Sequence, residues 1–284
     1  MVNCDSLQLY RFFDIGSAKL PVEARRGIPH HLIDIVDPDE IFTAGEYARA
    51  GRDVLLSVSQ QGRLPVVAGG TGFYLRALLD GLFPGPSRDE RLRERLAERQ
   101  NKTPGSLHRL LGRLDRDAAA RIHANDIPKI IRALEVRLLT RRPVSAWFHE
   151  KRDALKGYHA LKIGLSPTRE ALYKRLDLRC EQMFASGLVE EVRRILAMGF
   201  SPDVKPFESH GYRQALQLLK GELTEKEALF YAQRNTRQYA KRQMTWFRQE
   251  KDVEWFSGFG DDAGIQRAVL RRVQEYLKLK ITSR

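Results

Sequence analysis

Short apolar runs alternate with stretches of helical spacing along the first part of the chain. The apolar runs predict strands, and the stretches whose apolar residues recur every three or four positions predict helices. In chain order, we expect a strand over 1–5, a helical turn over 7–11, a strand over 31–36, a helix over 44–59, a buried strand over 64–68 and a helix over 73–79. Strand, glycine turn and helix in succession are typical of a parallel sheet with covering helices.

The pattern changes after a Pro- and Gly-rich stretch, Phe83–Ser87, which marks a boundary. From there to about residue 156 the spacing is helical and rich in Arg. Beyond it we expect a strand over 159–165 and helices over 167–185, 187–198, 211–220 and 224–247. The predicted fold class is therefore α/β, with a core formed by 1–87 and 161–284 and a helical insertion, 88–160.

Charge favours a polyanionic partner. The chain has 284 residues and carries 49 Lys and Arg against 36 Asp and Glu, a net +13 with a pI near 9.9. Residues 88–160 contribute 18 basic and 10 acidic side chains, so the insertion holds +8 of that charge. Because no amphipathic anchor stands out, we expect nucleic acid rather than membrane as the partner.

No stretch approaches the roughly 18 consecutive apolar residues of a membrane-spanning helix. Residues 1–10 lack the basic flank and apolar run of a signal peptide. Cys4 and Cys180 are too few and too far apart for a disulfide framework or a zinc module. These features predict a reducing, cytoplasmic location.

Asp5 comes directly after the first predicted strand, where open α/β sheets bind their ligands. A carboxylate in that position can act as a general base or hold a metal ion. The alternative is that Asp5, or Ser6 beside it, only caps the next turn. Spacing alone favours the capping role.

The turn Gly69–Gly72 also joins a strand to a helix. Glycines let the backbone approach a ligand closely, and a helix N-terminus favours anions. The turn is not a Walker loop, because no Lys-Ser/Thr pair follows it. From the residues alone, a tight structural turn and a substrate contact are about equally supported.

Four basic residues share one face of the last predicted helix: Arg234, Arg237, Lys241 and Arg248. With Trp246 and Phe247 nearby, this stripe suits RNA, because phosphates give affinity and unstacked bases lie on aromatic rings. A solvated helix with aromatics facing the core is the plainer alternative. Arg213 opens another helix after a Pro-containing loop and could reach an anion.

Taken in chain order, these motifs resemble the tRNA dimethylallyltransferase family. The segments that carry the resemblance are Asp5–Tyr10, Asp14–Lys19, Pro29–Asp34 with Asp37 and Pro38, Gly69–Gly72 with Tyr74 and Leu75, Asn125 and Asp126, Arg132–Glu135, Gly211–Gln214, and Arg237–Trp246. They cover nearly the whole chain. Adenylate isopentenyltransferases share the core, but the basic insertion favours the tRNA enzyme.

The resemblance implies a P-loop NTPase-like parallel sheet and the transfer of a dimethylallyl group from dimethylallyl diphosphate to the exocyclic amine of the adenosine 3′ of the anticodon in tRNA. It implies Mg²⁺ as cofactor, with no residue of this chain assigned as its ligand, and we expect a monomer. Asp5 would be the general base and Arg213 the diphosphate contact. The residues implied to contact tRNA are Ser6, Leu7, Gln8, Thr71, Arg93, Pro128, Lys129, Ile130, Ile131, Arg132, Arg237 and Lys241.

Two features depart from the family pattern. Its members begin with a strand, a Gly-x-x-x-x-Gly-Lys-Ser/Thr loop and a helix, and that loop pattern is absent from this sequence. We therefore expect one upstream strand–loop–helix unit in the natural protein. A shortened enzyme with little activity and a non-catalytic RNA-binding remnant are the alternatives. The second departure is Phe207–His210, where Glu208 puts an acid among positions that the family tends to make apolar or basic.

Overall fold

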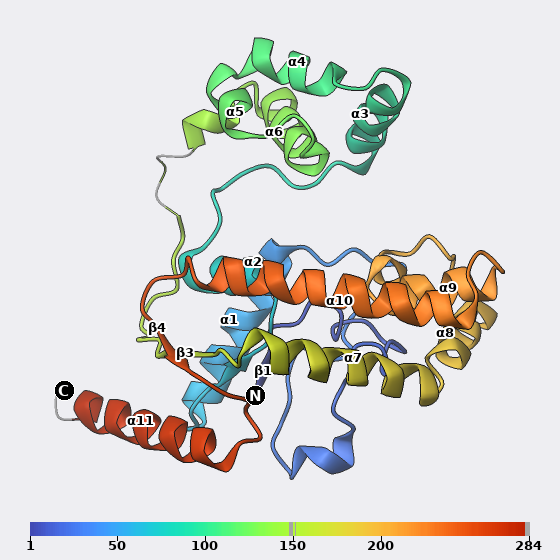
Figure 1. Cartoon of the computed structure of the whole chain (residues 1–284). Helices are drawn as coiled ribbons and strands as arrows, with labels where there is room; N and C mark the ends of the chain where they lie inside the picture. The colour runs from blue at the N-terminus through green and yellow to red at the C-terminus, as the bar shows by residue number, and fades with distance from the viewer. Residues whose placement is uncertain (148–149, 151, 282–284) are drawn as a thin grey trace. The chain divides into compact units, whose positions relative to one another are not determined.

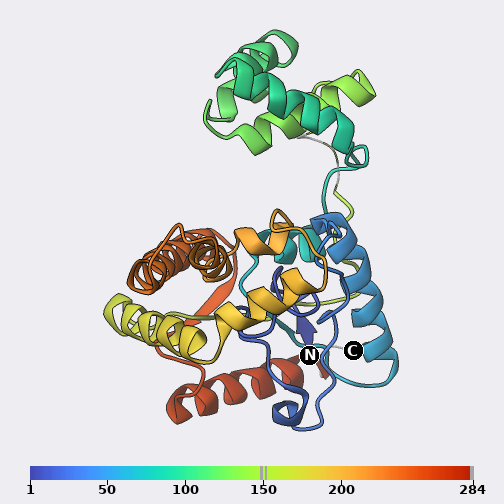
Figure 2. The same ribbon diagram turned by 90° about the vertical axis from the view of Figure 1, so that its right-hand side faces the viewer.

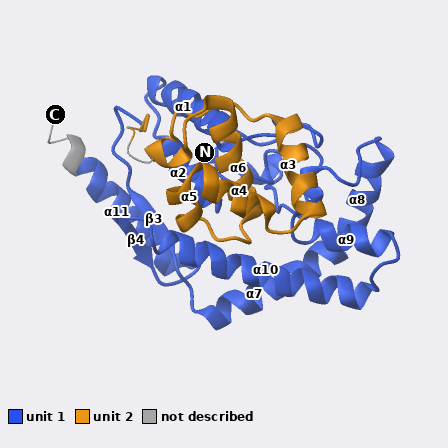
Figure 3. Ribbon diagram, turned by 90° about the horizontal axis from the view of Figure 1, so that it is seen from above, with its two compact units in different colours: residues 1–79, 155–284 blue, residues 80–154 orange. Residues whose placement is uncertain are grey.

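The computed structural model describes residues 1–147, 150 and 152–281, and the chain forms two compact units (Figures 1 and 3). The core unit consists of Met1–Leu79 and Leu155–Arg284, and the insertion unit of Asp80–Ala154. The sequence prediction places the insertion at 88–160, slightly later at both ends.

Two short parallel sheets lie in the core unit. Strand β1 (Val2–Asn3) pairs with β2 (Val67–Ala68), and β3 (Lys162–Leu165) pairs with β4 (Val253–Phe256), both in parallel. β1 lies between α1 (Ala44–Gln60) on one side and the helices formed by residues 169–247 on the other (Figure 2). The α/β class predicted from the sequence is confirmed.

The predicted burial of the segment 64–68 is wrong. Leu64 is 55% exposed and Val66 44%, and in the part of the chain that the structure describes β2 pairs only with β1. One edge of this strand therefore has no neighbouring strand there, and its apolar side chains remain accessible.

Two further predicted elements are absent. Residues 31–36 form no strand, because Leu32 and Asp34 have φ angles of 61° and 56° that interrupt an extended chain. Isolated bridges remain at each end, from His31 to Val2 and from Val36 to Tyr10. The predicted helical turn over 7–11 is a series of hydrogen-bonded turns instead.

The helices of the core unit follow the predicted spacing closely. Besides α1 they are α2 (Gly72–Asp80), α7 (Arg169–Ala185), α8 (Leu188–Ala197), α9 (Tyr212–Leu219), α10 (Glu225–Phe247) and α11 (Ala263–Ile281). α10 packs beside α7 and α9 (Figures 1 and 2). Thr224 forms a capping box with Glu227 and so fixes where α10 begins. Strand β4 and helix α11 were not predicted.

The insertion unit is helical, as its sequence predicts. It contains α3 (Glu90–Lys102), α4 (Ser106–Leu114), α5 (Arg116–Arg121) and α6 (Ile127–Thr140). Their apolar faces form one core, whose fully buried members include Leu107, Leu111, Ile130 and Leu134. This unit thus has a hydrophobic core of its own. Residues 148, 149 and 151, within the predicted insertion, lie outside the described residues.

None of the described helices combines the length and apolar character needed to cross a bilayer.

Candidate active site

Asp5 lies at the carboxyl end of β1, and its backbone is fixed by Asn3. The Asn3 side chain accepts a hydrogen bond from the Asp5 amide at 3.0 Å and donates to the Leu32 carbonyl at 2.8 Å. One carboxylate oxygen of Asp5, Oδ1, accepts from the amides of Leu7 at 2.8 Å and Gln8 at 3.4 Å. Oδ1 therefore has the capping role, whereas Oδ2 has no hydrogen-bond donor among the described residues.

Thr71 joins the glycine turn to the loop that carries Asp5. Its hydroxyl oxygen accepts from the Ser6 amide at 3.0 Å and lies 3.3 Å from the Ser6 hydroxyl. Its amide donates to the Cys4 carbonyl at 3.0 Å. The ends of two neighbouring parallel strands thus hold Asp5, Ser6 and Thr71 together, as their positions after the strands predict.

Close packing requires glycine at Gly69 and Gly72 of this turn, whereas the Gln243 side chain could move aside for a Cβ on Gly70. A Cβ on Gly69 would lie 2.3 Å from the Cys4 backbone. A Cβ on Gly70 or Gly72 would lie 2.1 Å from the side chain of Gln243 or Trp246, both on α10. The Gln243 amide also donates to the Gly70 carbonyl at 2.8 Å. The tight structural turn is therefore the better-supported role for Gly69–Gly72.

Cationic groups from α9 and α10 gather around His210, which precedes α9. Nη2 of Arg242 lies 3.4 Å from Nε2 of His210, and the rings of His210 and Tyr239 are 5.4 Å apart. Burial lowers the pKa of His210, and repulsion from Arg242 and Arg213 lowers it further. Burial raises the pKa of Tyr239, and the Asp5 carboxylate adds to that rise. Sequence reasoning missed His210 and Tyr239, because only the packing of α9 on α10 brings them here.

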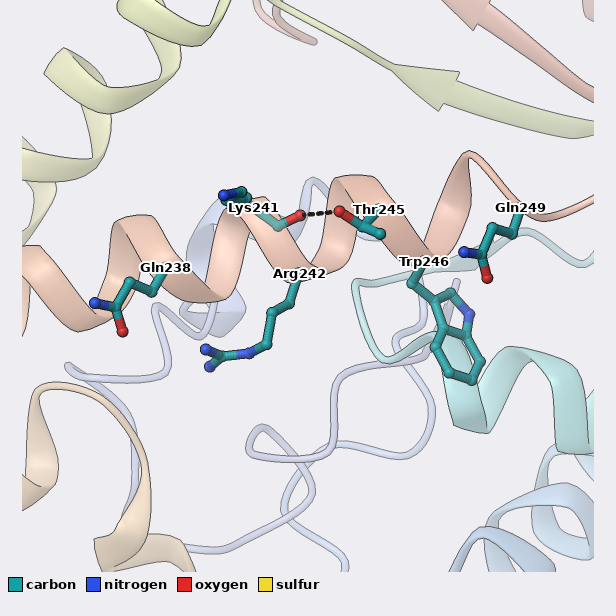
Figure 4. A pocket seen from close by; sticks show the side chains of 6 residues that line it. All are labelled: Gln238, Lys241, Arg242, Thr245, Trp246 and Gln249. Carbon is teal, nitrogen blue, oxygen red and sulfur yellow. Dashed lines mark hydrogen bonds between the residues drawn. The ribbon is translucent and has the colours of Figure 1, made fainter. Parts of the chain in front are cut away.

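Two hollows flank these groups. One, of about 320 Å³, has mainly aromatic and apolar walls; it is lined by Ser6, Leu7, Tyr10, Phe42, Tyr74, Lys205, Pro206, Glu208 and Ser209. The other, of about 450 Å³, runs along α10 and is lined by Gln238, Lys241, Arg242, Thr245, Trp246 and Gln249. Figure 4 shows Arg242 and Trp246 extending from the same side of this helix.

Other predicted residues of the core unit have varied surroundings. The Gln8 amide donates to the Ser17 carbonyl at 3.1 Å and so braces its own loop. Lys241 is exposed on the groove along α10. Arg237 forms an ion pair with Asp177 on α7, so its charge is compensated inside the fold. Arg213 is exposed in the first turn of α9 and has no carboxylate partner among the described residues.

A buried carboxylate links the Asp5 loop to α9. Glu191, 2% exposed, accepts from the Ile15 amide at 2.9 Å and from the Tyr212 hydroxyl. The Tyr212 oxygen in turn accepts from the Gly16 amide at 3.0 Å. Burial raises the pKa of Glu191 despite these donors. Because Tyr212 directly precedes Arg213, this contact fixes the start of α9 relative to the loop. No sequence pattern pointed to it.

In the insertion unit, Glu135 forms ion pairs with two arginines that the sequence predicts to contact tRNA. This carboxylate is fully buried and pairs with Arg93 at 3.0 Å and Arg132 at 2.6 Å. Ile130 and Ile131 are 0% and 7% exposed, so their side chains pack the core of the unit rather than face RNA.

Residues 128 and 129, at the start of α6, are the accessible part of the predicted tRNA-binding segment 128–132. Pro128 lies in the first turn of this helix, where a missing amide proton costs little. Lys129 is 72% exposed and pairs with Asp126. Within the segment 128–132, the ammonium of Lys129 is therefore the most exposed charge available to a polyanion.

The described residues do not form a metal site by themselves. No group of three or more His, Cys, Asp or Glu side chains among them lies close enough together to hold an ion. Asp5 offers a single open oxygen.

Together these features are those of an α/β enzyme. A carboxylate, Asp5, lies at the carboxyl end of a parallel strand, the charges of both Asp5 and Arg242 act on the Tyr239 phenol, and an aromatic hollow is lined by Ser6 and Leu7 of the same loop. Residues 8–250 match the model of the IPP transferase family. The chain belongs to this family, whose members are tRNA prenyltransferases that generally require a divalent metal ion.

Curated relatives and solved structures agree with the family model. The chain is 63% identical to the tRNA dimethylallyltransferase of Solibacter usitatus, over 98% of this chain and 90% of the relative. It is 54% identical to that of Koribacter versatilis, over 93% and 86%.

Among solved structures, the tRNA isopentenylpyrophosphate transferase of Bacillus halodurans is 34% identical, with a TM-score of 0.68 over 98% of this chain and 89% of that one. A eukaryotic dimethylallyltransferase acting on tRNA is 26% identical, with a TM-score of 0.79 over 94% and 70%.

Proposed function

We propose that this chain transfers a dimethylallyl group from dimethylallyl diphosphate to the exocyclic amine of the adenosine 3′ of the anticodon in tRNA. The observation that carries the proposal is the position of Asp5. Its Oδ2 has no donor among the described residues, and Arg242 acts on the same Tyr239 phenol as Asp5 does. Arg213 and Arg242, neither with a carboxylate partner among the described residues, both act on His210. A proton acceptor beside a site for a leaving anion is the pairing that this transfer needs.

The reaction can be written with these groups. The adenosine nitrogen forms a bond to the first carbon of the dimethylallyl group, and the carbon–oxygen bond to the diphosphate breaks. The diphosphate leaves with the bonding electrons, and Arg213 and Arg242 stabilise its growing negative charge. Asp5 accepts the proton that the amine loses. An aromatic amine is a weak nucleophile, so proton removal as the bond forms favours transfer.

The aromatic hollow next to Asp5 suits the planar base. A base in a stacked anticodon loop must swing out before a closed site can act on its amine. Ser6 and Leu7 line the hollow, and Tyr10, Phe42 and Tyr74 supply rings to its lining. We assign this hollow to the flipped adenosine.

The insertion unit is proposed to bind the anticodon stem. Its segment 88–160 holds +8 of the net charge of +13, which favours phosphates. Lys129 offers an exposed ammonium, whereas Arg93 and Arg132 share one buried carboxylate. We expect those two arginines to contribute mainly by shaping the unit.

Mg²⁺ is the divalent ion we propose, since it keeps several waters and binds phosphate oxygens without a protein cage. It would enter with the diphosphate. We also propose that the protein acts in the cytoplasm, where tRNA substrates are available, and that it acts as a monomer.

A transfer assay tests the proposal. Purified chain, labelled dimethylallyl diphosphate, Mg²⁺ and unmodified tRNA are incubated, and the modified nucleoside is located by mass spectrometry. The same assay is run on a version extended upstream by a strand, a Gly-x-x-x-x-Gly-Lys-Ser/Thr loop and a helix. Label on the adenosine 3′ of the anticodon with either version supports the proposal. Binding of tRNA without transfer by both would overturn it and favour a non-catalytic RNA-binding protein.

Lys241 and Arg237 are expected to affect tRNA binding differently. Lys241→Gln removes an exposed charge and should lower the slope of log affinity against log salt by about 0.7 to 1. Arg237→Gln should change the slope less, because Asp177 already compensates that guanidinium. Filter-binding titrations at several salt concentrations measure both slopes. Equal losses of slope would show that Arg237 leaves Asp177 to bind phosphate.

A further inference from the structure

His210 lies among the cationic groups of the candidate active site. It is half-buried between Arg242 of α10 and the start of α9, with Tyr239 beside its ring. His210 belongs to the segment Phe207–His210, which departs from the family pattern, and it takes no part in the transfer step proposed for Asp5, Arg213 and Arg242.

We propose that His210 is a third diphosphate-binding group, which takes up a proton when the diphosphate binds beside Arg213 and Arg242. The inference rests on the proposed function, because that function supplies the diphosphate. It assigns to this site a substrate-linked proton uptake in addition to the transfer chemistry.

Hydrogen-bonding geometry defines the starting state. A guanidinium only donates, so at 3.4 Å from Nη2 of Arg242 the Nε2 atom of His210 must present its lone pair. The imidazole is then neutral, with its proton on Nδ1. Protonation of Nε2 in this state would place two cations against each other.

The charged and titratable neighbours of His210 favour this neutral state. Arg213 on α9 and Arg242 on α10 are both cations, and Tyr239 on α10 is a neutral phenol with a raised pKa. The acids lie elsewhere: Asp5 influences Tyr239, and Glu208 pairs with Lys205. No carboxylate pairs with His210 among the described residues.

A diphosphate reverses this balance. Its oxygens bring negative charge between the guanidinium groups and the ring, so Nε2 can protonate and donate to a phosphate oxygen. The pKa of His210 is therefore low in the free protein and higher in the complex. Below the free-state pKa, affinity is high and independent of pH. Between the two pKa values it falls as pH rises, by at most about tenfold per pH unit.

The test measures proton uptake directly. Inorganic pyrophosphate is titrated into the full chain by calorimetry at pH 7, in buffers of different ionisation enthalpy, and the dependence on the buffer gives the protons bound per complex. The His210→Gln variant keeps a side chain that can accept from Arg242 but cannot become a cation. The His159→Gln variant removes an exposed histidine and serves as the control.

We expect His210→Gln to take up measurably fewer protons than the wild type and to bind several-fold more weakly at pH 6, with nearly equal affinity at pH 8.5. His159→Gln should match the wild type. The pyrophosphate itself titrates in this range, and His210→Gln retains that contribution, so the difference isolates His210. Equal proton uptake by the wild type and a folded His210→Gln variant would overturn the inference.

The transfer assay keeps this outcome separate from the proposed function. Transfer to tRNA with unchanged proton uptake in His210→Gln leaves the function standing and removes the role of His210. In active enzyme, His210→Gln should raise KM for dimethylallyl diphosphate at pH 6 more than it lowers kcat. A purely structural histidine would instead lower both at every pH, along with the melting temperature.

Discussion

Asp5→Asn should lower the rate of dimethylallyl transfer by about 10²–10⁴-fold, while tRNA affinity stays within several-fold of the wild type. The substitution suits the structure, because the Asn side-chain oxygen can still accept from the amides of Leu7 and Gln8. The turn is therefore kept, and only the ability to accept a proton is lost. Single-turnover transfer with saturating substrates measures the chemical step.

Two further substitutions distinguish the role of Asp5 as proton acceptor from its role as cap of the turn. Asp5→Ala loses both the proton acceptor and the cap, so it should be as inactive as Asp5→Asn and less stable, by about 1 kcal/mol. Asp37→Asn removes an exposed acid that pairs with Arg11, and it should leave transfer unchanged. If Asp5→Asn transferred at near wild-type rates, or lost tRNA binding instead, Asp5 would be a positioning residue and the base assignment would be wrong.

The helices of the core unit could be predicted because their signals are local. Thr43 and Thr224 begin α1 and α10 with capping boxes, and the apolar spacing that follows sets the buried face. The strands depend on partners elsewhere in the chain. The segment 31–36 has the composition of a strand, yet the left-handed residues Leu32 and Asp34 leave only bridges at its ends.

In the candidate site, too, some features follow from local sequence and others depend on partners far away in the chain. Asp5 and Thr71 could be brought together from sequence, since each follows a parallel strand of the same sheet. The contact of His210 with Arg242, and that of Glu191 with the amide of Ile15, join residues far apart in the chain. Such contacts depend on how helices pack, and periodicity carries no information about them. The same holds for the basic stripe on α10. From the sequence both Arg237 and Lys241 look available to phosphate, but in the fold Arg237 is paired with Asp177 whereas Lys241 is exposed.

Glu135→Leu should produce the largest loss of stability in the insertion unit. This fully buried carboxylate accepts from the Asp89 amide at 2.9 Å, from Arg93 at 3.0 Å and from Arg132 at 2.6 Å. Asp89 caps α3, so Glu135 ties the start of that helix to α6. Removing one partner of a buried ion pair costs about 3 kcal/mol, and here two guanidinium groups lose theirs.

Hydrogen exchange gives the sharpest readout of this loss, since global melting would mix the two units. Peptides from α3 and α6 of Glu135→Leu should exchange faster than those of the wild type by about 10²-fold, because about 3 kcal/mol of local stability is lost. Peptides from α7 and α10 should be unchanged. Glu98→Gln, an exposed change on α3, is the control and should have no effect.

Measurement of tRNA binding tests whether the buried Glu135 and its partners matter for the proposed function. If the insertion unit grips the anticodon stem through a folded surface, Glu135→Leu should weaken tRNA binding even though its own side chain faces no solvent. Glu135→Gln keeps one oxygen as an acceptor and should fall between the wild type and Glu135→Leu in both protection and affinity. Lost protection with unchanged tRNA affinity would mean that the charges of this unit act without its fold. The assignment of the stem to the insertion surface would then have to be abandoned.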